Sequence, residues 1–170
     1  MELLAFILST LGTVCICIAP LLKGKKMGLT LLCVFSANIL VASSYLLTGA
    51  LTGAASCFVG GAQAIVNFFF DRKNKPLPKW LVAIYGLSFV AVNLLVFKGW
   101  TDLIAMAASL IFILCIGQKN GKKYRRWTFA NTALWLTYDI VNLSYGPMTT
   151  HGIQLMFVIS GMLMHDIRKK

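Results

Sequence analysis

The chain is poor in acidic residues, with five Asp and Glu against sixteen Lys and Arg in 170 positions. It also lacks paired carboxylates, a phosphate-binding P-loop and the glycine pattern of dinucleotide sites. The two histidines, His151 and His165, have no acid cluster around them in the sequence. Hydrolysis inside a membrane would need a nucleophile with a base or a second acid. We therefore expect a protein that is not an enzyme and that uses no cofactor.

The cysteines provide neither a disulfide framework nor a metal site. All five lie inside apolar runs, where no oxidising compartment would pair them: Cys15, Cys17, Cys33, Cys57 and Cys115. The spacing of Cys15 and Cys17 puts their side chains on different faces of a helix, which is a poor start for a metal site. We expect the cysteines to be small apolar packing residues and expect no metal.

Long hydrophobic runs are what the chain has in abundance. It is 58% hydrophobic with a mean hydropathy of +0.78, too apolar for a soluble domain. A membrane span needs about 20 residues to cross a core of roughly 30 Å. The approximate spans are Leu3–Leu22, Met27–Leu47, Leu51–Phe70, Trp80–Phe97, Trp100–Gly117, Arg126–Ser144 and Met148–Met164. The sequence thus predicts an all-α membrane protein of seven transmembrane helices, with residues 1–170 forming a single integral membrane domain.

The basic residues lie in every second gap between the spans. Apart from Lys98, all Lys and Arg fall in Lys23–Lys26, Arg72–Lys79, Lys119–Arg126 and Arg168–Lys170. Short positively charged loops stay on the cytoplasmic side, so we predict the N-terminus outside and the C-terminus in the cytoplasm. We expect these charges to mark topology and to touch anionic lipid headgroups. Nucleic acid is not expected as a partner, because the basic segments lack interleaved aromatic residues apart from Tyr124.

The two halves of the chain share a spacing. Gly24–Lys26 recurs as Gly121–Lys123, 97 residues later. The same offset aligns Leu46 with Leu143, Gly49 with Gly146 and Thr52 with Thr149. We predict two parallel three-helix repeats, residues 1–72 and 100–170, joined by a linker helix in 73–99 that restores the orientation of the chain. An ordinary seven-helix bundle with chance similarity is the alternative.

Asp139 is the only acid deep inside a predicted span. It lies twelve residues beyond Trp127 at the span's edge, which is roughly 18 Å at about 1.5 Å per residue. An ionised carboxylate at that depth is costly, so Asp139 should face the bundle interior and have a partner or a proton. It is either a functional acid or a carboxyl that bonds a neighbouring helix.

A polar and aromatic stripe surrounds Asp139. Helical spacing puts five residues on one face: Asn131, Trp135, Tyr138, Asp139 and Asn142. Such a stripe should not face lipid, so it forms either a cavity wall or a seam of interhelical hydrogen bonds. Trp135 lies too deep for the interfacial belt, which leaves stacking or packing as its role.

Polar side chains on other spans are further candidates. Gln63 and Asn67 share a stripe on the third span, where we expect them to line a cavity. Asn38 on the second span is a buried amide that could belong to a seam or to a site. His151, near the start of the last span, could titrate near neutral pH, although a histidine there also serves as a cap or an interfacial residue.

Two segments resemble a known family. Tyr45–Ala55 (YLLTGALTGAA), followed in the second half by Trp135–Asp139 (WLTYD), resembles the YgjV-type family of bacterial inner-membrane proteins. The resemblance covers most of the chain in length and in the order of spans, and it implies a location in the bacterial inner membrane. Members of the family often carry a basic residue midway along the third span. This chain has Ala62 and Gln63 there, so a role for that charge does not transfer.

The predicted three-plus-one-plus-three order of helices is also similar to that of the SWEET sugar transporters, the PQ-loop proteins and the nicotinamide-riboside carriers. That similarity implies a solute bound between the two halves. The PQ signature is absent: the first span ends Pro20-Leu21, and the equivalent point of the fifth is Gly117-Gln118. Sugar specificity therefore does not transfer with the architecture.

We predict a small-solute transporter or facilitator with a central site between the two repeats, in which Asp139 binds a solute or a coupling proton. The predicted substrate-binding residues are Asp139, Tyr138, Asn142, Trp135, Asn131, Gln63, Asn67, Asn38 and His151. Membrane lipids and a second copy of the chain are the other expected partners. The alternative is a non-transporting scaffold, partner subunit or lipid-interacting protein. A water-accessible cavity at Asp139 would favour transport, and a dry, hydrogen-bonded carboxyl would favour the alternative.

Overall fold

The computed structural model describes residues 2–22, 27–47, 51–95, 97, 99–141 and 145–167. Seven α-helices make up most of these ranges, and the ranges contain no strand. The helices are α1 (Glu2–Ile18), α2 (Met27–Leu47), α3 (Leu51–Arg72), α4 (Lys79–Leu95), α5 (Thr101–Ile116), α6 (Gly121–Val141) and α7 (Tyr145–Met162). A short 3-10 helix, η1 (Ala19–Leu21), continues α1, and a π-helical turn, η3 (Leu163–Ile167), continues α7. The predicted all-α class with seven helices is confirmed.

The start of α6 differs from the prediction. The helix begins at Gly121, five residues before the predicted Arg126. The side-chain oxygen of Asn120 accepts hydrogen bonds from the backbone N–H groups of Lys122 and Lys123, at 2.8 and 3.4 Å. An asparagine in this position caps a helix by satisfying its first free donors. Most of the basic segment 119–126 is therefore helical and is not a loop.

The helices differ in how well they suit a membrane. Three stretches are long and apolar enough to cross one, namely Leu3–Leu21, Met27–Ser44 and Ala54–Arg72. Helices α4 and α5 are apolar but have 17 and 16 residues, about 25 Å at 1.5 Å per residue. Large apolar side chains point outward along the bundle, for example Leu87 and Leu95, which are 70% and 85% exposed. Such a surface suits contact with lipid. The number of seven spans stays a prediction.

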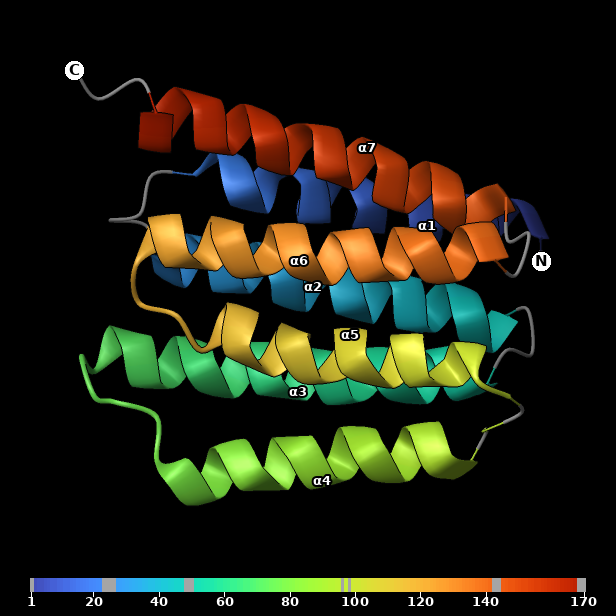
Figure 1. The fold of residues 1–170 in the computed structure, drawn as a ribbon, viewed down its shortest axis with the longest axis horizontal. Helices are drawn as coiled ribbons and strands as arrows, with labels where there is room; N and C mark the ends of the chain where they lie inside the picture. Colours follow the sequence, from blue (N-terminus) through green and yellow to red (C-terminus); the bar gives the residue numbers. More distant parts are fainter. Residues whose placement is uncertain are drawn as a thin grey trace.

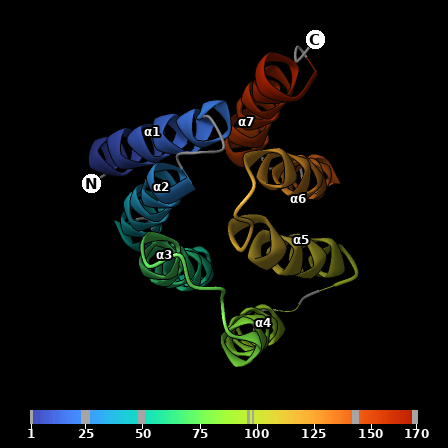
Figure 2. The same cartoon turned by 90° about the vertical axis from the view of Figure 1, so that its left-hand side faces the viewer.

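The bundle consists of two rows of helices. Each helix packs against the next along the chain, so α1, α2 and α3 form one row and α5, α6 and α7 form the other. Helix α4 stands beside the rows, where it packs against α3 and α5 (Figure 1 and Figure 2). The rows meet through α1 with α7 and through α3 with α5. The two termini lie at opposite ends of the bundle (Figure 1).

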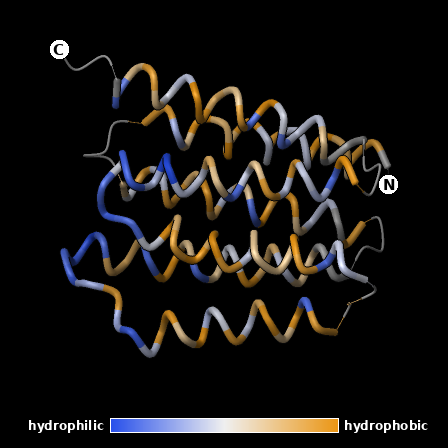
Figure 3. The backbone as a smooth tube through the Cα atoms, viewed as in Figure 1, coloured by the Kyte–Doolittle hydropathy of each residue, from blue (hydrophilic) through white to orange (hydrophobic). Residues whose placement is uncertain are grey.

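The two ends of the bundle differ in polarity. The hydrophilic connections from α3 to α4 and from α5 to α6 gather at one end, which we call the basic end (Figure 3). The opposite end, where α5 and α7 begin and α6 finishes, is the far end. The orientation of these ends in the membrane stays a prediction.

The apolar core of the described residues lies in the half of the bundle toward the basic end. Its buried members come from both rows: Ala19, Met27, Leu31, Val34, Ala64, Cys115, Ile116 and Tyr124. A smaller cluster of Tyr85, Phe89 and Ile113 joins α4 to α5 and to half-buried apolar residues of α3. Since both rows contribute to the first cluster, the basic half of the bundle holds the rows together by apolar packing.

Candidate functional site

Asp139 pairs with His151 toward the far end. Asp139 lies two residues before α6 finishes and is 2% exposed, and His151 lies in the second turn of α7. Oδ2 of Asp139 is 2.5 Å from Nδ1 of His151, whose side chain is 23% exposed. Both residues were predicted as candidates, and the structure brings them together.

Two aromatic residues frame this pair. The ring of Trp135 stacks on that of His151, with centroids 5.9 Å apart and planes 15° from parallel. Tyr138 meets Trp135 edge to face at 5.8 Å, and its hydroxyl donates a hydrogen bond to Oδ1 of Asp102 on α5 at 3.4 Å. Asp102, Trp135, Tyr138, Asp139 and His151 thus form one group, which we call the far-end cluster.

The far-end cluster has the chemistry of a proton or cation site. An imidazole and a carboxylate in contact can share a proton, and the pair becomes an ion pair only when the histidine is protonated. The Trp135 ring stacks on His151 and so covers one face of the imidazole. Asp102 was not predicted as a site residue. Asp102 lies at the start of the fifth predicted span, at the same end of the bundle as the last turn of the sixth. That position in the sequence could have identified it.

A second set of interior polar side chains has one or more atoms without a hydrogen-bond partner among the described residues. Gln63 on α3 is fully buried, and neither its amide nitrogen nor its amide oxygen has a partner among the described residues. The same holds for the side-chain oxygens of Asn67, Thr132 and Tyr85. Gln63 and Asn67 were predicted to line a cavity, whereas Thr132 and Tyr85 were missed. Threonine and tyrosine are ordinary residues of apolar helices, so nothing in the sequence distinguishes these two.

The remaining predicted residues take other places. The Asn131 amide donates to the backbone oxygen of Ala108 at 2.7 Å and joins α6 to α5, and the Asn38 amide donates to Val34 of its own helix at 2.8 Å. The side-chain oxygen of Asn38 lies so close to Gly60 that a Cβ there would be 2.8 Å away. Both asparagines therefore bond main-chain carbonyls and not the far-end cluster. Asn142 lies outside the described residues.

One basic residue departs from its predicted role. Arg125 was expected to mark topology and contact lipid, yet it is 3% exposed. Its Nε donates to Oδ2 of Asp166 at 3.0 Å, its Nη2 pairs with Oδ1 of the same carboxyl, and its Nη1 donates to the Leu22 backbone oxygen at 3.3 Å. Next to it, Nε2 of His165 lies 2.8 Å from the Leu21 backbone oxygen. The expected lipid contact was therefore wrong for Arg125, whose side chain lies within the bundle, while its role in topology stays a prediction.

The hydrogen bonds from Arg125 lower the pKa of the Asp166 carboxyl below its ordinary value of 3.8. We call Arg125, Asp166 and the Leu22 carbonyl the basic-end clamp. It links α6 and the end of α7 to the end of the first helix, and so it ties the second row to the first.

The described residues contain no group of three His, Cys, Asp or Glu that could hold a metal ion. All five cysteines are free.

The chain matches a known protein-family model over nearly its whole length. A family model described as that of a bacterial inner membrane protein, Imp-YgjV, matches residues 3–168. No curated protein and no solved structure matches the chain, so the likeness to SWEET-type transporters stays a prediction. The family match covers nearly the whole chain and confirms the resemblance seen in Tyr45–Ala55 and Trp135–Asp139. The chain belongs to the Imp-YgjV family of bacterial inner membrane proteins.

Proposed function

We propose that the protein is a small-solute transporter or facilitator with a polar site midway along the bundle, between the two rows of helices. Gln63 carries this proposal. It lies near the middle of α3, is 0% exposed, and has no hydrogen-bond partner for either amide atom among the described residues. A buried polar group left unpaired costs about 1–3 kcal/mol. A solute or water that bonds Gln63 would offset that cost.

The far-end cluster supplies a group that can couple transport to protons. Asp139 is closed off by His151, whose ring remains partly exposed. Protonation of His151 strengthens its contact with Asp139, and protonation of Asp139 as well removes the attraction. A change in the protonation of this pair therefore changes the attraction that holds α6 to α7 at the far end. This link predicts uptake that depends on pH through Asp139 and His151.

The arrangement of the rows supports a parallel repeat. A twofold axis along the membrane normal would exchange α1 with α5 and α3 with α7, and it would turn the contact of α1 with α7 into that of α5 with α3. Both contacts occur. Transporters built on such repeats bind their solute at the interface of the halves, near the middle of the membrane. Gln63 on α3 and Thr132 on α6 lie at this depth, one in each row.

The burial of Asp139 favours a second function. Its carboxyl is hydrogen-bonded and 2% exposed, as expected for a seam between α6 and α7 in a non-transporting scaffold or partner subunit. In that case the far-end cluster is structural, and substitutions there change stability without changing the movement of any solute.

The first experiment is a thermal-shift screen of metabolites on the purified protein at pH 5.5 and pH 7.5, since a ligand raises the unfolding temperature by mass action. Any metabolite that raises it is then used, radiolabelled, in uptake by reconstituted vesicles. We expect Gln63→Leu to lose uptake and Asp139→Asn to lose its pH dependence, with both variants folded.

Asn93→Leu is the matched control for Gln63→Leu, because it removes a buried amide that is already bonded within its own helix at 2.8 Å. Uptake should survive this change. Equal uptake by Gln63→Leu, Asn93→Leu and the unsubstituted protein would contradict the central site. If uptake by Asp139→Asn has the same pH profile as uptake by the unsubstituted protein, proton coupling through this acid would be contradicted.

A further inference from the structure

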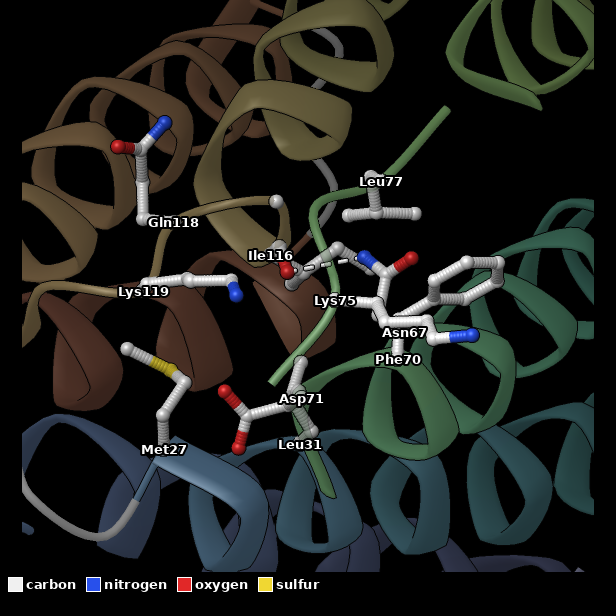
Figure 4. Close-up of a pocket in the computed structure, with 11 residues that line it drawn as sticks. Met27, Leu31, Asn67, Phe70, Asp71, Lys75, Leu77, Ile116, Gln118 and Lys119 are labelled. Carbon is white, nitrogen blue, oxygen red and sulfur yellow. Dashed lines mark hydrogen bonds between the residues drawn. The ribbon is translucent and has the colours of Figure 1, made fainter. Parts of the chain in front are cut away.

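A small pocket opens at the basic end between the two rows. It is lined from α2 by Met27 and Leu31, from α3 by Asn67 and Asp71, and from the end of α5 and the following loop by Ile116 and Lys119, among others (Figure 4). Its volume of about 30 Å³ is room for roughly one or two water molecules. The pocket thus lies at the junction of the two rows.

The mouth of this pocket carries opposite charges that do not pair. The carboxylate of Asp71 and the ammonium of Lys119 point into the pocket from opposite rows (Figure 4). Among the described residues, neither belongs to an ion pair. Charges of both signs at an entrance attract polar solutes and water.

One face of α3 continues the pocket inward. Asp71, Asn67 and Gln63 are spaced four residues apart and so share a face, each about 6 Å deeper than the last. Asn67 donates through its amide nitrogen to the Ile116 backbone oxygen at 2.9 Å, while its amide oxygen has no partner although the residue is 2% exposed. One turn further in, both amide atoms of Gln63 are unpartnered.

We infer that this pocket is the mouth of a hydrated polar passage that runs along α3 from the basic end to Gln63. Water bonds the free oxygen of Asn67 and the amide of Gln63, because buried polar groups are satisfied by protein or by ordered water. A small neutral solute with hydroxyl or amide groups follows the same route. The statement that a solute uses this route rests on the proposed function, whereas the statement that water fills the passage does not.

Thiol labelling tests the passage without a known substrate. Gln63→Cys, Asn67→Cys, Lys75→Cys and Phe69→Cys are made in a chain whose native cysteines are replaced, with serine at Cys115 to keep its 2.8 Å contact with the Thr128 hydroxyl. The probe is a charged, membrane-impermeant methanethiosulfonate, added to each side of vesicles in turn. Lys75 lines the pocket mouth and identifies the side of the basic end. Phe69, on another face of α3 and 53% exposed, is the lipid-facing control.

We expect Asn67→Cys and Gln63→Cys to react from the side at which Lys75→Cys reacts, at least about tenfold faster than Phe69→Cys, because only a thiol in water ionises and attacks. If Asn67→Cys and Gln63→Cys both reacted only as fast as Phe69→Cys, the passage would be overturned. Reaction at Asn67→Cys alone would also overturn it, since the pocket would then end before Gln63. Labelling without uptake of any solute would leave the passage standing and count against transport.

Hydroxyl-radical footprinting of the unsubstituted protein tests the same inference if the cysteine variants fail to fold. Phe70 lines the pocket, and Phe112 is another half-buried ring, packed against the apolar core. Internal water should make Phe70 oxidise several-fold faster than Phe112. Equal rates would overturn the passage.

Discussion

Among the described residues, two carboxylates each pair with a basic side chain, and the two pairs differ in what they can do. At the basic end Asp166 bonds Arg125, and at the far end Asp139 bonds His151. A guanidinium is always charged and holds a carboxylate through two parallel hydrogen bonds. An imidazole gains and loses its proton near neutral pH. The first pair is therefore fixed, and the second can be switched.

The pairs also differ in what they connect. Arg125 reaches the Leu22 carbonyl and so joins the second row of helices to the first. His151 and Asp139 lie on α6 and α7, within one row, and His151 is partly exposed. The comparison indicates that the rows are locked together at the basic end, while the far end keeps a group whose charge can change. Because the rows are held together at the basic end, water would reach the interior through the proposed passage along α3 and not by separation of the helices.

The largest effect should come from removing the fixed pair. Arg125→Met leaves the Asp166 carboxyl buried without its partner, which costs about 3–5 kcal/mol when a buried ion pair is broken on one side. Denaturant unfolding in detergent measures the change. Arg126→Met, an exposed neighbour, is the control and should change the unfolding free energy little. Adding Asp166→Leu to Arg125→Met should recover part of the loss. If Arg125→Met lowered the unfolding free energy as little as Arg126→Met, the basic-end clamp would not contribute to stability.

Close packing of the rows at the basic end should give the next effect. A Cβ on Gly161 of α7 would clash with the Pro20 backbone oxygen, so Gly161→Ala must push α7 away from the end of the first helix. We expect a loss of about 1–3 kcal/mol in unfolding free energy, as for other overpacked sites. Gly152→Ala, on the same helix with open space around its Cβ, is the matched control. Equal stability of the two variants would contradict close contact between the rows.

Acid should weaken the fixed pair in a defined direction. The pKa of Asp166 is lowered in the folded protein by hydrogen bonds from Arg125. Its contribution to stability is then complete above the ordinary value of 3.8 and is lost as the pH falls below that value toward the folded pKa. Thermal unfolding between pH 6 and pH 3 measures the decline. Arg125→Met should show a shallower decline than the unsubstituted protein, and identical slopes would contradict the assignment.

The helices and several site residues could be predicted because they depend on short-range patterns. Runs of apolar residues mark the helices, and a lone carboxylate such as Asp139 is conspicuous in one of them. The pairing of Asp139 with His151 depends on how α6 and α7 pack, which their sequence spacing does not determine. The sequence did not distinguish Arg125 from its neighbour Arg126, because composition does not show which residue of a basic segment is buried. Asn120, by contrast, offered a readable cap signal that would have placed the start of α6 correctly.

The smallest effect should be spectroscopic and should come from the switchable pair. Because the His151 ring stacks on Trp135, protonation of His151 puts a cationic electron acceptor against the indole and quenches its fluorescence. We expect Trp135 emission to fall as the pH is lowered from 8 to 5, the range in which histidines commonly titrate. The contribution of Trp135 is the difference between the unsubstituted protein and Trp135→Phe.

His151→Gln should abolish this change, because glutamine has no ring that can take up a proton. Arg126→Met is the control, since this exposed residue lies at the other end of the bundle and should leave the change in emission unaltered. An emission that does not respond to pH in the unsubstituted protein would mean that His151 keeps one charge state throughout. The far-end pair would then be as fixed as the clamp, and the difference between the two ends would disappear.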